Sequence, residues 1–313
     1  MHKRIFSSLV IAALILLTFF SGCTSSTVRE NPVTVAGEKT PAEVHTAAEI
    51  RTTPPTARQM TSTPAVLPAG TREHTFAYVL NGVKGTVSVP LSDSVYADYL
   101  KKPDLQFKSP YTANTNSSTF LAYLDDPEQQ SAIAALTQAI QEKTPNKDDQ
   151  ARIAVTLVQH IPYVNQVRQY RYPYEVLYKN EGVCGEKSML LALLLKHLGF
   201  GSSVFYFLPE DHMTTGIKVS SPYDFRNSGY AFIEATEPYI ITDSTTDTLA
   251  QWKFTSTMEV TPVGTGYALQ SIASDYNDAR QWAALAAKGK TLSTSDYQAW
   301  QALNTKYDLS YYT

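Results

Sequence analysis

Residues 181–188 read Glu-Gly-Val-Cys-Gly-Glu-Lys-Ser, and residues 189–195, which follow, are only Met, Leu and Ala. A segment that is apolar on all sides predicts a helix buried in the centre of a domain rather than one lying on its surface. Gly199 comes directly after Leu198 and is a typical helix C-cap. We therefore expect a central helix from about Cys184 to Leu198, with Cys184 in its first turn.

Cys184 is one of only two cysteines, and the other, Cys23, falls in an export signal. A domain sent to an oxidising compartment usually pairs its cysteines or lacks them. Here a single thiol is kept where the N–H groups and the dipole of a helix favour a thiolate. Position alone leaves two interpretations open, a reactive nucleophile or a small buried side chain, because free Cys is among the most buried residue types.

The first twenty-three residues predict a secretory signal. Lys3 and Arg4 precede a mostly apolar run at residues 5–20, which is short for a membrane span and suited to a signal peptide. The following Ser-Gly-Cys resembles a bacterial or archaeal lipobox, with Phe20 where Leu is preferred. The resemblance implies that Cys23 becomes the lipid-modified first residue of the mature chain; an ordinary signal with an incidental Cys is the alternative.

Residues 24–70 contain no Phe, Tyr or Trp and are dominated by Thr, Pro, Ala and Ser. Such a segment cannot bury enough apolar surface to offset its ordering entropy, so we expect a flexible tether. The composition changes abruptly at residues 75–80. The folded part is expected to comprise an N-terminal hairpin and helix (71–145), a core (146–250) and a C-terminal helical extension (251–313).

The formal net charge of −3 gives no reason to expect a nucleic-acid partner. The chain has no phosphate-binding glycine loop and no CxxC or HExxH spacing. We accordingly expect no cofactor and no metal site.

Hydrophobic periodicity gives a coarse map of the folded part. A hairpin is expected over residues 75–90 around an Asn81-Gly82 turn. Helices are expected to open at Asp125-Asp126-Pro127 and at Asn146, the second reaching about His160, whereas residues 161–180 are expected to be a loop with extended stretches. After the Cys helix we expect strands at 203–208, 213–219 and 230–235, a fourth at 239–242, and helices at 274–287 and 293–307. A buried helix packed on an antiparallel sheet makes this an α+β domain.

A cysteine nucleophile needs a base, and the base needs an orienting partner. The six histidines can be sorted by position: His2 is lost with the signal, His45 lies in the tether, His74 is at the domain edge, and His160 and His197 stand at helix ends, where a dipole or solvation role is ordinary. His212, at the start of a predicted strand, is the remaining candidate for the base.

Glu234 interrupts the apolar strand expected at residues 230–235. A carboxylate there is costly to bury unless something pairs with it, and the imidazolium of His212 would be such a partner. The order of Cys on a helix, His on one strand and a carboxylate on the next predicts a Cys184–His212–Glu234 triad.

Residues 174–188 resemble the active-site segment of the transglutaminase-like superfamily of papain-like thiol enzymes. They read Tyr-Glu-Val-Leu, a short polar loop, Gly-Val-Cys, an acidic residue and a small residue that leads a Leu-rich helix. The sequence Leu-Gly-Phe-Gly at 198–201, ahead of a strand, also matches. The resemblance covers about residues 147–245, implies a papain-like core, and aligns the family's His with His212 and its Asp-Pro-Thr with residues 234–236.

The chain departs from the family pattern in three ways. Thr214 stands where an aromatic residue is usual, the acid is Glu rather than Asp, and residues 220–229 make a longer connection. These departures bear mainly on the acid, for which Asp243 is the alternative to Glu234.

The implied roles follow from general chemistry. Cys184 attacks a carbonyl carbon as a thiolate, His212 protonates the leaving amine and then activates the second nucleophile, and Glu234 fixes the imidazole tautomer. The N–H of Cys184 is one oxyanion donor, and Tyr163 is a candidate for the other. Tyr174 and its neighbours Arg168, Tyr170, Arg171 and Tyr172 line a cleft or form an ordinary surface loop.

Two functions from different classes are consistent with the sequence. The first is a lipid-anchored, extracytoplasmic cysteine peptidase or acyltransferase that acts on protein or peptide amides. The second is a non-catalytic module of the same fold that serves in binding or envelope assembly. A third hypothesis is a zinc ion bound by Cys184, His212 and Glu234. It is disfavoured because the sequence has no further cluster of Cys or His residues.

Overall fold

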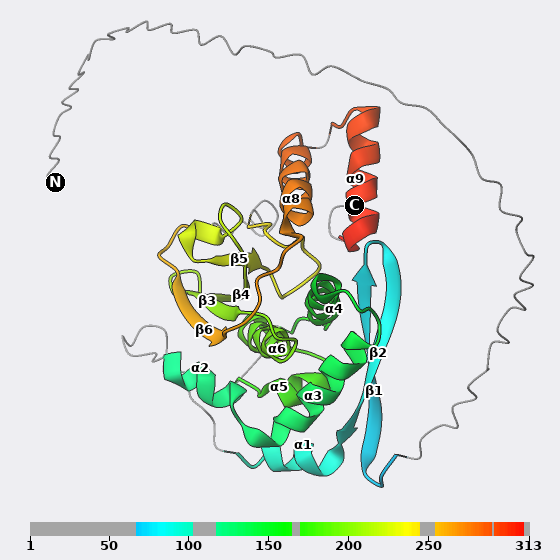
Figure 1. Ribbon diagram of the computed structural model, residues 1–313, viewed down its shortest axis with the longest axis vertical. Coiled ribbons are helices and arrows are strands. Elements are labelled where there is room, and N and C mark those ends of the chain that lie inside the picture. Colours follow the sequence, from blue (N-terminus) through cyan, green and yellow to red (C-terminus); the bar gives the residue numbers. More distant parts are fainter. Residues whose placement is uncertain (1–66, 103–116, 165–169, 245–253, 290, 310–313) are drawn as a thin grey trace, which may run out of the picture. The chain divides into compact units, whose positions relative to one another are not determined.

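The computed structural model describes residues 67–102, 117–164, 170–244, 254–289 and 291–309 (Figure 1). The expected signal, Cys23 and the tether up to residue 66 lie outside these ranges. The first feature of the described part is a long antiparallel hairpin of β1 (Thr71–Leu80) and β2 (Val83–Ser92). Asn81 and Gly82 both have positive φ (51° and 80°), as a two-residue type I′ turn requires. The predicted hairpin is confirmed and is longer at both ends.

Two helices cover one face of this hairpin. α3 (Pro127–Gln141) begins where Asp126 accepts the Glu128 N–H at 3.1 Å, and α4 (Lys147–Gln159) begins where Asn146 accepts the Asp149 N–H at 3.2 Å. Both starts were expected, because these residue types satisfy free N–H groups at helix N-termini. Thr156 on α4 donates to the Val79 carbonyl at 2.9 Å and so ties α4 to β1.

Three short helices were not expected from the sequence. They are α1 (Asp93–Tyr99), α2 (Ser117–Leu124) and α5 (Pro173–Lys179). The prediction of a loop throughout residues 161–180 is wrong for α5. Pro173 fixes its first φ, the Glu175 carboxylate accepts the Tyr172 N–H at 2.9 Å, and Asn180 ends it at φ 51°.

The central helix is α6 (Cys184–His197), as expected. Its residues from Gly185 to Leu195 are all buried, because α3, α4 and α5 and a sheet surround it (Figure 1). The chain leaves it through Gly199 at φ +90°, a backbone conformation that glycine adopts without strain.

That sheet is antiparallel with the order β5-β4-β3-β6. Its strands are β3 (Ser202–Phe207), β4 (His212–Lys218), β5 (Tyr230–Ile233) and β6 (Glu259–Gly264). One face meets α6, where Ser202 donates to the Ala192 carbonyl and Thr215 to the Ser188 carbonyl. A cluster of phenylalanines covers the opposite face: Phe205, Phe207, Phe232 and Phe254.

The fourth strand is not the one predicted. Residues 239–242 form a connection that ends in a turn, with Thr242 at φ 78° and its N–H bonded to the Phe232 carbonyl. The actual fourth strand, β6, pairs with β3 at an edge of the sheet, where Pro262 is tolerated. β6 lies in the part of the chain expected to be a helical extension, so the sheet draws on residues beyond 250.

The last two helices, α8 (Ile272–Ala287) and α9 (Thr294–Tyr307), were expected and lie side by side (Figure 1). They enclose a small core of their own around Trp282, Leu285 and Leu303. The turn of the hairpin reaches this pair, since the Gly82 N–H donates to the Lys306 carbonyl at 2.9 Å.

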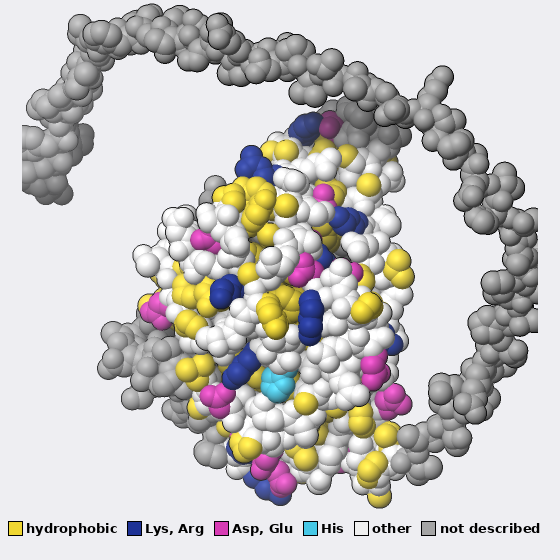
Figure 2. Space-filling model, viewed as in Figure 1, with side chains coloured by type: hydrophobic (Ala, Val, Ile, Leu, Met, Phe, Trp, Pro, Cys, Tyr) yellow, Lys and Arg dark blue, Asp and Glu magenta, His cyan; other side chains and the backbone are white. Residues whose placement is uncertain are grey.

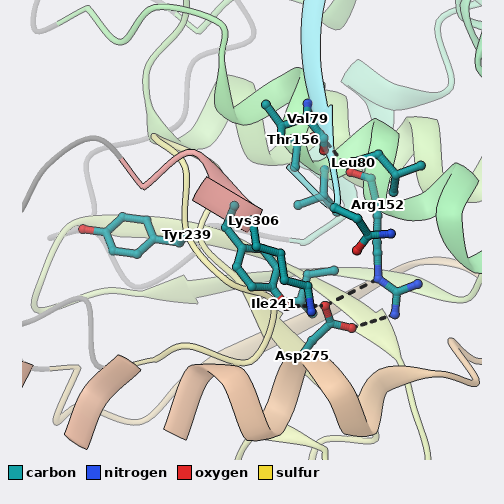
Figure 3. Close-up of a pocket in the computed structure, with 11 residues that line it drawn as sticks. Val79, Leu80, Arg152, Thr156, Tyr239, Ile241, Asp275 and Lys306 are labelled. Carbon is teal, nitrogen blue, oxygen red and sulfur yellow. Dashed lines mark hydrogen bonds and ion pairs between the residues drawn. The ribbon is translucent and has the colours of Figure 1, made fainter. Parts of the chain in front are cut away.

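A cavity of about 20 Å³ lies where the hairpin, α4, α8 and α9 meet (Figure 3). Across it Arg152 and Asp275 form an ion pair at 2.7 Å, with both side chains largely buried. The volume suits one water molecule. None of the predicted triad residues lines the cavity, so it belongs to the packing of the helices rather than to the candidate site.

The described domain is therefore mixed helix and antiparallel sheet, which confirms the α+β class. No helix within the described ranges is long and apolar enough to cross a membrane. On the face drawn in Figure 2, acidic and basic side chains lie scattered among each other without a patch of one sign.

Candidate active site

Cys184 is the first residue of α6, and its thiol is free and half-buried. The first intrahelical bond here runs from the Lys187 N–H to the Val183 carbonyl at 2.9 Å. The N–H of Cys184 lies in the first turn, where helical N–H groups have no partner within the helix. Cys184 thus combines a thiol with a backbone donor at the positive end of the helix dipole.

The start of α6 is fixed by a buried ion pair. Glu186 has no exposed surface, and its carboxylate accepts the Val183 N–H at 3.0 Å and three N–H groups of Arg171 at 2.7–3.1 Å. Arg171 also pairs with Glu181 at 2.8 Å. These contacts hold the residues before Cys184 against the helix that Cys184 begins.

Two hydroxyls attach the next turn of α6 to β4. Ser188 donates to the Met213 carbonyl at 3.0 Å, and Thr215 donates to the Ser188 carbonyl at 3.1 Å. His212 is the first residue of β4 and directly precedes Met213. The helix that carries Cys184 and the strand that carries His212 are therefore joined within one residue of His212.

His212 meets the carboxylate predicted for it. Its Nε2 lies 2.9 Å from Oε2 of Glu234, whose side chain is 3% exposed. Burial alone disfavours the imidazolium, but the charge of Glu234 and the neighbouring Cys184 side chain outweigh it and raise the pKa of His212 to about 10. His212 therefore stands between Glu234 and Cys184, and at neutral pH its imidazole is charged.

Both oxygens of Glu234 are used. Oε1 accepts the N–H of Thr236 at 2.9 Å and its hydroxyl at 2.7 Å, while Oε2 faces His212. Burial would raise the pKa of Glu234, but His212 and these bonds hold it below its ordinary value. The alternative acid, Asp243, is buried in the turn after Ile240, and the carboxylate that contacts His212 is that of Glu234.

Tyr163 lies at the entrance to the site. Its backbone pairs with Gly182, two residues before Cys184, and its side chain is 47% exposed. Partial burial and then the nearby Cys184 and Glu234 raise the pKa of its hydroxyl, so that it remains a hydrogen-bond donor. This position suits the oxyanion role expected of Tyr163.

Tyr170 is a second ring beside the thiol. A Cβ on Gly185 would lie 2.4 Å from Cε1 of Tyr170, so only glycine at this position allows the ring to reach the first turn of α6. Burial, then the proximity of Cys184, raises the pKa of Tyr170. In the sequence, Tyr170 was one of several candidate cleft or loop residues, and no local pattern distinguished it from the others.

Tyr174 was expected either to line a cleft or to lie in a surface loop. Both alternatives are wrong for Tyr174, which is buried in the core and exchanges hydrogen bonds with the backbone of Ser92. Tyr172 is buried between Tyr99 and Tyr123, and Arg171 holds Glu186. Arg168 lies outside the described residues.

Two neighbours of the site were missed from the sequence. Phe254 stacks on His212 with ring centroids 5.1 Å apart, and the adjacent backbone is fixed where Thr255 and Ser256 donate to Glu210. Lys187, one turn after Cys184, is fully buried and donates to three backbone carbonyls. A lysine just before an entirely apolar run is unusual, so the sequence pattern could have indicated Lys187. No local pattern indicated Phe254.

Among the described residues, no group of three His, Cys, Asp or Glu side chains, the triad included, is arranged to hold a metal ion. The arrangement instead suits nucleophilic chemistry, in which a thiol, an imidazole and a carboxylate act in series. The chain matches no model of a known protein family, and a search of curated proteins likewise gave no match.

Proposed function

We propose that this chain is a lipid-anchored, extracytoplasmic thiol enzyme with a transglutaminase-like, papain-like core, which cleaves or transfers peptide or isopeptide amide bonds. The observation that carries the proposal is the placement of His212 between the buried carboxylate of Glu234 and a thiol at the start of a buried helix. A carboxylate that sits 2.9 Å from one ring nitrogen leaves the other, Nδ1, for Cys184.

The charge state of His212 favours this chemistry. An imidazolium beside Cys184 stabilises a thiolate, which is the nucleophilic form of cysteine. The raised pKa of His212 means that the imidazolium persists at neutral pH. In the proposed mechanism the reactive pair is a thiolate and an imidazolium, oriented by Glu234.

In the first step the Cys184 sulfur forms a bond to the carbonyl carbon of an amide, and the π electrons move to the oxygen. In this proposal the N–H of Cys184 and the hydroxyl of Tyr163 donate hydrogen bonds to this oxyanion. The C–N bond then breaks as His212 gives its proton to the leaving amine, which leaves a thioester and a neutral imidazole.

In the second step water or an amine attacks the thioester. His212 takes the proton of this nucleophile, the C–S bond breaks, and the thiolate–imidazolium pair is restored. Hydrolysis and acyl transfer share every residue and differ only in the attacking molecule. Protein or peptide amides are the substrate class that this mechanism serves.

The test is the alkylation of Cys184 by iodoacetamide at pH 6, followed by peptide mass spectrometry on the full-length chain. A thiolate held by His212 should react much faster than a free thiol, whose ordinary pKa is about 8.5. We expect His212→Ala to slow the reaction sharply and Cys184→Ala to abolish labelling at this position. Equal, slow reaction of wild type and His212→Ala would exclude the catalytic role and leave a binding module of the same fold.

A further inference from the structure

Lys187 is a buried cation that the mechanism above does not use. It has no exposed surface, and its Nζ donates to the carbonyls of Gln159 at 3.2 Å, Ile161 at 2.5 Å and Thr236 at 2.6 Å. Three acceptors match the three donors of an ammonium group, whereas a neutral amine has only two N–H groups. The geometry therefore fits the charged form.

The cost of this arrangement points to a role other than packing. Burying a cation is unfavourable, and a Met or Leu, as found at residues 189–191 of the same helix, would pack there without that penalty. Burial lowers the pKa of Lys187 to about 7, opposed by the carboxylates of Glu234 and Glu237. Because burial of this charge is unfavourable, the role of Lys187 is sought in the three carbonyls that it binds.

The three carbonyls belong to the two segments that complete the candidate site. Gln159 is the last residue of α4, and Ile161 follows it on the way to Tyr163, whose backbone pairs with Gly182. Thr236 is the residue whose N–H and hydroxyl hold Oε1 of Glu234. Lys187 stands on α6, one turn after Cys184, so it connects the thiol's helix directly to both.

Gln159 reinforces the same connection. Its side-chain N–H₂ donates to the Glu234 carbonyl at 2.8 Å and to the Tyr239 carbonyl at 3.0 Å, while its own carbonyl accepts from Lys187. The end of α4 is thus hydrogen-bonded to the backbone carbonyl of Glu234, the proposed acid. α4, α6 and the end of β5 form one hydrogen-bonded unit around the Lys187 ammonium group.

We propose that Lys187 is a positioning residue of this site: its ammonium group sets the distances of Glu234 and of the Tyr163 segment from Cys184. The inference rests on the proposed function for its catalytic consequence. The His212–Glu234 contact itself should depend on Lys187 whether or not the site is active.

The experiment uses the full-length chain with Cys23→Ser, which leaves Cys184 as its only thiol. Lys187→Met keeps a long apolar side chain and removes all three donors. Leu193→Ala is the matched control, because Leu193 is buried on the same helix six residues after Lys187 and its side chain has no polar atom that could hydrogen-bond to the site. Two quantities are measured beside the melting temperature: the downfield NMR proton of the His212–Glu234 hydrogen bond, and the rate of Cys184 alkylation at pH 6.

We expect Lys187→Met to lose the downfield proton and to slow alkylation roughly tenfold or more, since a displacement of about 1 Å can cost a hundredfold in rate. Leu193→Ala should keep both at a comparable loss of melting temperature. Retention of the proton in Lys187→Met, or its parallel loss in both variants, would overturn the proposal.

Two further outcomes are decisive. If wild-type Cys184 reacts slowly but the proton is still lost only in Lys187→Met, the proposed function fails and the positioning role stands. If Lys187→Met does not fold, Lys187→Gln, which keeps two donors, takes its place. Failure of both to fold would make Lys187 a requirement of the fold and overturn its assignment to the site.

Discussion

Glu234 and His212 are 22 residues apart in the chain, and their side chains meet at 2.9 Å between Oε2 and Nε2. Thr236 occupies the other oxygen of Glu234, which leaves the carboxylate no freedom to turn away. A buried carboxylate fixed in this way raises the pKa of the imidazole through its charge and orients the ring through its hydrogen bond.

Replacing Glu234 by Gln should lower the pKa of His212. The amide has nearly the same shape but no charge, so the largest effect that opposes burial is removed and the pKa should fall well below about 10, with Cys184 alone left to raise it. The measurement is an NMR titration of the His212 ring. Asp243→Asn is the control, because Asp243 was the alternative acid; a larger effect from Asp243→Asn would reassign the acid.

The same contact makes stability depend on pH. The pKa of His212 is higher in the folded chain than the ordinary 6.5, so the imidazolium stabilises the fold fully below about pH 6.5, and this contribution is lost as the pH rises towards 10. Lys187 acts in the opposite sense, because its pKa is lowered to about 7 and its contribution to stability increases as the pH rises from there towards 10.5. The His212 contribution is therefore read as a difference in urea unfolding: the free energy of unfolding should fall more, or rise less, with pH in the wild type than in Glu234→Gln, and an identical slope in the two proteins would contradict the assignment.

Gly185→Ala should disturb the site through Tyr170. The new methyl group would lie 2.4 Å from the ring, so Tyr170 must move from beside Cys184. Overpacking of this kind costs about 1–3 kcal/mol. In a Tyr170→Ala background the same substitution should cost much less, which a double-mutant cycle of denaturant unfolding measures. Equal costs in the two backgrounds would mean that the ring and the glycine are not in contact.

How far the sequence predicts this molecule depends on how local each signal is. The Leu-rich helix, the caps at Asp126 and Asn146, and the Asn81-Gly82 turn were all predicted, because each is encoded within a few neighbouring residues. The pairing of His212 with Glu234 was predicted because a carboxylate inside an apolar strand requires a partner.

The failures share a non-local cause. β6 has weak alternation and an internal proline, and it is a strand only because β3 offers it an edge. Tyr174 was assigned to a cleft or a surface loop, yet its hydroxyl bonds to the backbone of Ser92 in the hairpin, some eighty residues earlier. Phe254 reaches His212 from a segment with no motif at all.

Cys23→Ser should change how the protein is held at the membrane. If Cys23 carries lipid, this variant either is released in soluble form or accumulates as an unprocessed precursor, because one acyl-modified residue is the expected anchor. Membrane fractionation and intact-mass measurement of wild type and variant check this. A soluble, unmodified wild-type mature chain would exclude the lipid anchor.

The final prediction concerns the ion pair at the start of the Cys184 helix. Arg171→Met would leave the carboxylate of Glu186, which has no exposed surface, without its charged partner. Removing one member of a buried pair costs about 3–5 kcal/mol, because the remaining charge is neither solvated nor compensated. The matched control is Lys101→Met, which removes an exposed pair with Asp98 and should cost less than about 1 kcal/mol. Urea unfolding of both variants measures the difference. Similar small losses would mean that water reaches Glu186 in solution and that Arg171 does not fix the start of α6.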